Sequence, residues 1–146
     1  MMLADYLDKD RILLNVTAEK YRDMLVRMLE TSAEQDKLCV VDNILQREKI
    51  MPTAIGKGIF LPRAVLRDKS KSEVIIATNP SGLSFEDYGP MQAYIIVLFL
   101  FSEKDDSAAI LAQTLRLLSD DTLRSDILES IAPIDVIKAI SEWEEE

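Results

Sequence analysis

Apolar side chains recur every three or four residues over five stretches of the chain, and this spacing predicts five helices. The first is expected from a cap at Thr17 to about Ala33, and the second from Leu38 to about Lys49. Three more are expected near the C-terminal end: one starting near Asp106, one capped by Ser119, and one with Pro133 in its first turn. The positions expected to face inward are Tyr21, Met24, Leu25, Met28, Leu29, Val41, Ile44, Leu45, Ile110, Leu111, Leu115, Leu118, Leu123, Ile127, Leu128, Ile134, Ile137 and Ile140.

Short apolar runs rich in β-branched residues occupy the middle of the chain and predict strands. Ile59 to Leu66 is expected to be extended, with Pro62 indicating an edge or a strand end. Glu73 to Thr78 predicts a second strand, followed by a turn at Asn79 to Gly82. Ala93 to Phe101 is apolar without alternation, as in a central strand covered on both faces. With helices at both ends, residues 1–146 are expected to form one α/β domain in which a mixed sheet lies between helical layers.

Composition and charge restrict the class of partner. The chain is 48% apolar and 29% charged, as in a soluble globular protein, and its net charge of −9 disfavours nucleic acid and anionic membrane surfaces. The longest apolar run is too short to cross a bilayer, and residues 1–11 lack the pattern of a signal peptide. We therefore expect a cytoplasmic protein without membrane insertion. Its oligomeric state stays open, although apolar residues near Met1 to Leu7 could serve a dimer, and Trp143 is expected to anchor an otherwise solvated tail at 142–146.

The sequence contains no histidine and one cysteine. Acid–base catalysis by imidazole, a histidine-ligated metal and a phosphohistidine are therefore impossible within this chain. Cys39 excludes an internal disulfide and is expected to be a small buried apolar residue near the start of the second helix. No metal and no cofactor are expected.

The segment REKIMPTAIGKGIFLPR, from Arg47 to Arg63, closely resembles the active-site segment of enzyme IIA domains of the bacterial phosphotransferase system. The similarity is to the fructose/mannitol-type and nitrogen-related members. It continues through Ser81 to Phe85, the run Ala93 to Phe101, and LAQTLRLLSDDTLRSDIL at Leu111 to Leu128. It implies a mixed β-sheet flanked by helices on both sides.

The resemblance also implies where the chemistry of the family lies. The histidine that accepts a phosphoryl group from the phosphocarrier HPr corresponds to Arg63, and a second, assisting histidine corresponds to Ser107. A guanidinium keeps its proton and offers no lone pair to phosphorus, so Arg63 cannot be the acceptor. The residues matching Arg47 and Thr53 line the phosphoryl pocket of the family. Together with Arg63 they suit an oxyanion, either a phosphate or a carboxylate.

Three functions follow from these residues. The first is a regulatory enzyme IIA-like module that binds a protein partner, such as a transporter, a kinase or another regulator, through this cleft. The second is a sensor domain linked to transport that binds an oxyanion. The third, an active phosphoryl carrier, is disfavoured by the missing histidines. A structural reading stands beside them: Arg47 would pair with Glu48 or Asp42, and Arg63 would point into water.

Overall fold

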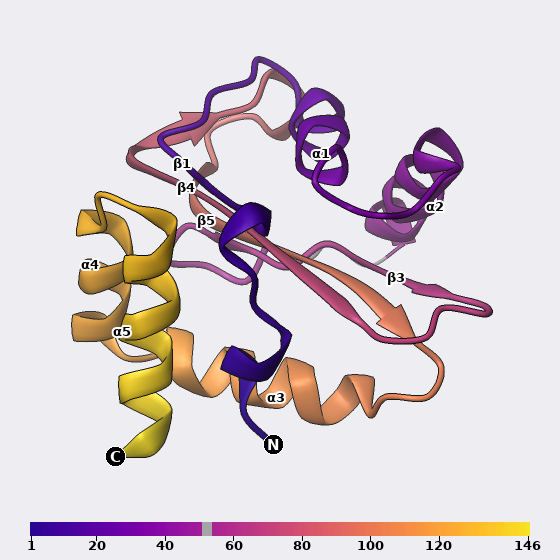
Figure 1. The fold of residues 1–146 in the computed structure, drawn as a ribbon. Coiled ribbons are helices and arrows are strands. Elements are labelled where there is room, and N and C mark those ends of the chain that lie inside the picture. The colour runs from indigo at the N-terminus through magenta and orange to yellow at the C-terminus, as the bar shows by residue number, and fades with distance from the viewer. Residues whose placement is uncertain (51–53) are drawn as a thin grey trace.

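A computed structural model describes residues 1–50 and 54–146. It has five strands in one mixed sheet, with five α-helices and three short 3-10 helices in the described residues (Figure 1). The elements follow the chain in the order η1 Leu3–Tyr6, η2 Lys9–Arg11, β1 Ile12–Leu14, α1 Tyr21–Leu29, α2 Lys37–Ile50, β2 Ile59–Phe60, β3 Arg63–Leu66, β4 Glu73–Ser84, η3 Glu86–Tyr88, β5 Gln92–Ser102, α3 Ser107–Leu118, α4 Asp121–Glu129 and α5 Pro133–Glu145.

Strand β5 is the centre of the sheet. It pairs antiparallel with β4 along one side, while β2 and β3 pair with it in parallel, one after the other, along its other side. Strand β1 completes the sheet beyond β4. Residues 93 and 95–101 are all buried, which confirms the expectation of a central strand covered on both faces. The predicted edge character of residues 59–66 is confirmed too, with Pro62 between β2 and β3.

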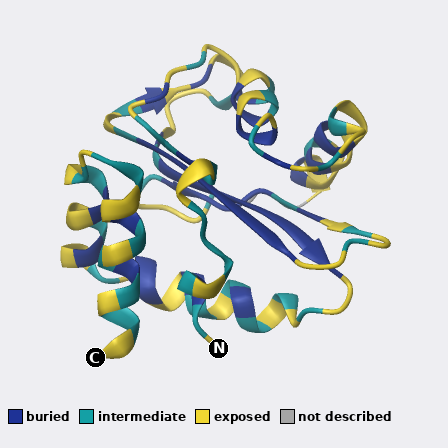
Figure 2. Ribbon diagram, viewed as in Figure 1, coloured by how far each residue is buried: buried dark blue, intermediate teal, exposed yellow. Residues whose placement is uncertain are grey.

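Two apolar cores lie on opposite faces of the sheet (Figure 2). Helices α1 and α2 cover one face, and Tyr21, Met24, Leu25, Met28 and Leu29 are completely buried there, as their spacing predicts. Helices α3, α4 and α5, with η1, cover the other face. The α/β architecture with helices on both sides of a mixed sheet is therefore confirmed. No described helix is both long and apolar enough to span a bilayer.

Two helix caps differ from the prediction. Helix α1 begins at Tyr21, and its first N–H group donates to the Asp87 carboxylate at 3.1 Å, so a distant residue replaces the predicted cap at Thr17. Helix α4 is capped by Asp120, whose carboxylate accepts hydrogen bonds from two N–H groups of the first turn. The hydroxyl of Ser119 instead donates to the Arg116 carbonyl at 2.7 Å. Each cap is an aspartate, whose charge suits a helix N-terminus.

The turn predicted at Asn79 to Gly82 is wrong, because β4 continues through these residues. The register with β5 shifts between Thr78 and Leu83, so the segment is an irregularity within a long strand. The Asn79 side chain accepts from the Ser81 N–H group and donates to the Val16 carbonyl, each at 2.9 Å. Residues typical of turns thus form a local bend here without reversing the chain.

Several burial predictions are also wrong. Cys39 is exposed, since α2 turns Val40, Val41 and Ile44 inward. Leu115 and Ile134 are exposed, and their helices bury Leu117 and Val136 instead. At the N-terminus, Leu3 is buried, and the N–H groups of Leu3 and Ala4 donate to the Glu144 carboxylate of α5.

The two chain ends are thereby joined. Among the apolar residues near Met1 to Leu7, Leu3 is buried and Met1 is 57% exposed, and the tail at 142–146 is mostly helical. Trp143 does anchor this tail, since its indole N–H group donates to the Asp120 carboxylate at 3.1 Å.

An ionic network ties the start of β4 to the loop between α1 and α2. The Glu73 carboxylate accepts hydrogen bonds from the Lys69 ammonium at 2.5 Å and from the Ser32 hydroxyl at 2.8 Å. Lys69 also contacts Glu34 at 2.8 Å, and Arg11 lies 3.8 Å from Glu73. Burial raises the pKa of Glu73, but these partners together outweigh it and lower that pKa below its usual value.

This network predicts an acid-sensitive contribution to stability. Because the pKa of Glu73 is lowered on folding, its stabilisation is present above the usual pKa of a carboxyl group and is lost as the pH falls through the lowered value. We expect Glu73→Gln to lower the free energy of unfolding by about 1–2 kcal/mol at pH 7 and by less at pH 3, which lies below the ordinary pKa of a carboxyl group. Urea denaturation at both pH values measures this, with Glu103→Gln, a change at an exposed glutamate, as the control. If the free energy of unfolding fell equally at both pH values, the stabilisation by Glu73 would come from the packing of its side chain and not from its charge.

Candidate functional site

Helix α2 lies against β3 (Figure 1), and these two elements carry the two arginines singled out in the sequence. Arg47 lies exposed in the last turn of α2, where the helix dipole favours a cation. Arg63 is the first residue of β3 and is half-buried, and its Nη1 atom donates to the Leu61 carbonyl at 3.4 Å. Burial lowers the pKa of Arg63, the positive charge of Arg47 lowers it further, and the Glu48 carboxylate opposes both. Two cations therefore share one small region.

The two acids that could pair with Arg47 have other partners in the described residues. Asp42 forms its ion pair with Arg22 of α1, at 2.7 Å. Glu48 is buried and accepts hydrogen bonds from the Tyr21 hydroxyl at 3.3 Å and the Tyr88 hydroxyl at 2.8 Å. Within the described residues, Arg47 forms no ion pair with a carboxylate.

Arg63 does not simply point into water either, because it is half-buried and its guanidinium donates to the Leu61 carbonyl. A half-buried guanidinium beside a second cation, with one long hydrogen bond to a carbonyl, keeps donors available for an anion.

The other two predicted site residues are not joined to these arginines. Ser107 is the first residue of α3, half-buried and next to the capping Asp106. It forms no hydrogen bond with Arg47 or Arg63 in the described part of the chain. Thr53 lies outside the described residues. The candidate site is therefore carried by Arg47 and Arg63.

Sequence reasoning missed the aromatic cluster that holds Glu48. The rings of Tyr21, Phe60, Phe85 and Tyr88 lie in mutual contact, with centroids 4.9–6.2 Å apart. Burial and the bond to Glu48 raise the pKa of Tyr88, so its hydroxyl stays protonated as a donor. The signal was present: Glu48 follows Ile44 by four residues, on the buried face of α2. This cluster holds Glu48, and through it the end of α2, in place.

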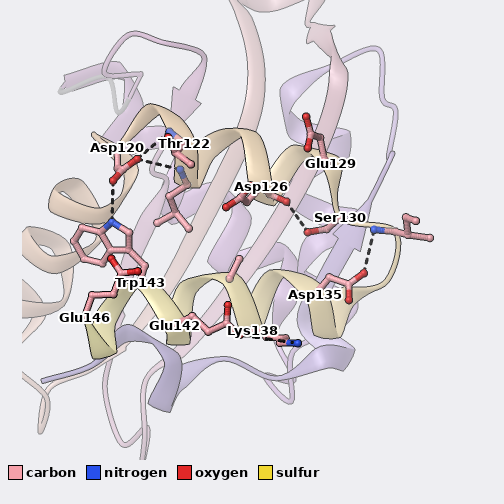
Figure 3. Close-up of a pocket in the computed structure, with 13 residues that line it drawn as sticks. Asp120, Thr122, Asp126, Glu129, Ser130, Asp135, Lys138, Glu142, Trp143 and Glu146 are labelled. Carbon is pink, nitrogen blue, oxygen red and sulfur yellow. Dashed lines mark hydrogen bonds and ion pairs between the residues drawn. The ribbon is translucent and has the colours of Figure 1, made fainter.

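Two surface grooves lie near the helices. One, of about 920 Å³, runs between α1, α2 and η3 and includes Glu48 and Tyr88 but neither arginine of the site. The other, of about 470 Å³, lies between α4 and α5 (Figure 3). Its lining includes six carboxylates and one cation, Lys138. Asp120 and Asp135 there are used as helix caps, and the negative lining makes this groove unsuitable for an anion. In the described residues no cluster of histidine, cysteine or carboxylate side chains could hold a metal ion.

Comparison with known proteins agrees with this architecture. Residues 5–143 match the family described as "Phosphoenolpyruvate-dependent sugar phosphotransferase system, EIIA 2". The chain belongs to this family. Among curated proteins, it is 23% identical to the PTS system fructose-specific EIIABC component of Bacillus subtilis, over 97% of this chain and 23% of that protein. It thus spans about a quarter of that relative's length.

Solved EIIA structures share the fold. The nitrogen regulatory protein IIA-Ntr of Neisseria meningitidis superposes with a TM-score of 0.78 at 15% identity, covering 94% of this chain and 98% of that one. The complex of enzyme IIAMTL and phosphorylated enzyme IIBMTL from Escherichia coli gives 0.73 at 17% identity, covering 93% and 97%. These likenesses establish the EIIA fold for this chain. In that complex an EIIA protein binds a phosphorylated protein partner.

Proposed function

We propose that this chain is a regulatory EIIA module that carries no phosphohistidine and binds a phosphoryl or carboxylate group of a protein partner through Arg47 and Arg63. The observation that carries the proposal is the proximity of these two cations at the position where the family resemblance puts the phosphoryl acceptor. Without any histidine, the chain has no residue to perform the family's transfer chemistry.

Electrostatics favour an anion at this position. The mutual repulsion of the two guanidinium groups is an unfavourable interaction that an anion between them would remove. Residues 47–67 contain five cations and one carboxylate, whereas the whole chain has a net charge of −9. Guanidinium groups also match the oxygen spacing of phosphate and carboxylate. A local positive region on an acidic protein selects a partner that presents negative charge here.

Binding of a phosphorylated peptide tests this function. We expect a phosphoserine peptide, added to the isotopically labelled protein, to shift the Nε–Hε resonance of Arg63. In Arg63→Ala the affinity is expected to fall at least tenfold, which corresponds to about 1.4 kcal/mol. Arg27→Ala, which removes an equal charge from the exposed side of α1, is the matched control and should bind as the native protein does.

Inorganic phosphate in a parallel titration separates a protein-binding module from an oxyanion sensor. A module that recognises a protein should bind the peptide more tightly than free phosphate, because peptide contacts add to those of the phosphate. Equal affinities would favour the sensor. No change in the Arg63 resonance with either probe would refute the cleft as a binding site.

A further inference from the structure

Strand β3 lies at an edge of the sheet, and its exposed side combines two charges with an apolar residue. In the described part of the chain, β3 pairs with β5 alone, so no strand covers its other side. Val65 is 45% exposed, an unusual exposure for a β-branched residue in the middle of a strand. Arg63 precedes it by two residues, and the exposed Arg67 follows it by two. Edge strands normally avoid such an apolar group in solvent.

The pairing with β5 also fixes which backbone groups point outward. Arg63 lies opposite Phe99 in register, and the Phe99 N–H group donates to the Pro62 carbonyl at 2.9 Å. In a parallel ladder, alternate residues turn their N–H and C=O groups toward the same neighbour. Ala64 and Leu66 therefore face β5 with these groups, and Arg63 and Val65 turn theirs toward the open edge.

The side chains alternate in the same way. Ala64 is buried in the core beneath α1 and α2, and Leu66 packs against that core. Arg63 and Val65 alternate with these two core-facing residues, Arg63 being half-buried and Val65 exposed. If a partner strand were added to this edge, its alternate side chains would lie beside Arg63, Val65 and Arg67 in turn.

We propose that the partner of the arginine cleft presents an extended acidic segment that adds to the edge of β3 as a further strand. Its side chains would alternate: a carboxylate or phosphorylated residue beside Arg63, an apolar residue on Val65, and a second acidic residue toward Arg67. Main-chain hydrogen bonds to Arg63 and Val65 would supply affinity, and the two arginines would select the charge pattern. This inference rests on the proposed function and specifies the form of its partner.

Charge complementarity selects this occupant over a second copy of the chain. The edge strand of a second copy would bring Arg63 and Arg67 of both molecules together, and like charges on paired strands are destabilising. An acidic strand removes that repulsion instead. The charged flanks thus block self-pairing of β3 while they favour an acidic partner.

The test uses a heptapeptide in which glutamate flanks a central isoleucine at alternate positions, with threonine between them. We expect it to shift the amide resonance of Val65 and to slow hydrogen exchange of that amide. The same peptide, N-methylated at the amide groups that would face β3, keeps its charge but cannot donate those hydrogen bonds. Its affinity is expected to be at least tenfold lower. Val65→Pro, which removes the outward N–H group, should act in the same direction, whereas Val65→Thr should not.

The outcomes separate this inference from the proposed function. Equal binding of the two peptides would overturn strand addition, while loss of both in Arg63→Ala would keep the charged cleft. Binding of the phosphoserine peptide at Arg63 without any binding of the heptapeptide would likewise overturn the inference alone. Failure of all the probes would overturn both.

Discussion

The native chain is expected to take up no phosphoryl group from phosphoenolpyruvate, enzyme I and HPr. The physical reason lies at one position. We infer from the resemblance that Arg63 corresponds to the acceptor of the family, and a guanidinium has no free lone pair with which to attack phosphorus. Burial and the charge of Arg47 lower the pKa of Arg63 below its ordinary value, but a guanidinium stays protonated at neutral pH. Radiolabelled phosphoenolpyruvate, followed by electrophoresis under alkaline conditions, measures the uptake.

Arg63→His is the comparator for that assay. A histidine at the start of β3 would lie half-buried beside Arg47, whose charge favours the neutral imidazole that can accept a phosphoryl group. We expect this variant to gain label, from none toward one phosphoryl group per chain. Arg27→His, at an exposed position on α1, controls for the mere presence of an imidazole and should stay unlabelled. Stoichiometric label on the native chain would mean that another residue accepts the group, and the proposed loss of transfer would be wrong.

The central elements of the fold were predictable from sequence because their apolar patterns are strong and local. The run at 93–101 is apolar throughout, without alternation and without a charged residue, a pattern typical of a strand covered on both faces. Helix α1 buries every residue that its spacing indicates. In these segments, local preference and tertiary burial point to the same structure.

Features that depend on distant partners were not predictable. The cap of α1 comes from Asp87, which lies 66 residues from Tyr21 in the sequence. Local sequence patterns could not identify so distant a cap, so they indicated Thr17 instead. The turn predicted at Asn79 to Gly82 was wrong, because β4 pairs with β5 on both sides of this segment, and that long-range contact keeps it within the strand. Cysteine is usually buried, yet the orientation of α2 leaves Cys39 exposed to solvent.

The candidate site divides in the same way. The resemblance pointed to Arg47 and Arg63, and the structure brings their charges close enough to affect one another. The role of Glu48 depends on Tyr21 and Tyr88, which come from two other elements and meet it only in the folded chain. Burying a carboxylate without hydrogen-bond donors costs free energy. A glutamate at an inward-facing position of a helix therefore indicated that donors from other elements would contact it.

Gly58→Ala is expected to cause a large loss of stability, about 3–5 kcal/mol from backbone strain and overpacking together. Gly58 has a φ of +71°, which residues with a Cβ atom rarely adopt. An added Cβ would overlap the ring of Tyr94. The backbone cannot withdraw, because the Gly58 carbonyl accepts hydrogen bonds from the N–H groups of Tyr94 and Ile95, at 2.8 and 3.1 Å. Urea denaturation, monitored by circular dichroism, measures the loss.

Gly56→Ala separates the two causes. Gly56 also has a positive φ, of +90°, but no atom lies within 4 Å of the position that a Cβ would take. Backbone strain alone should therefore cost about 1–3 kcal/mol there, at the lower end because the residue is exposed and its surroundings can relax. The Tyr94 ring also touches Gly82 on β4, 3.2 Å from a Cβ at that position, so it has little room to move aside. If both variants lost the same stability, the Tyr94 ring would have moved aside, and overlap with that ring would not explain the larger loss expected at Gly58.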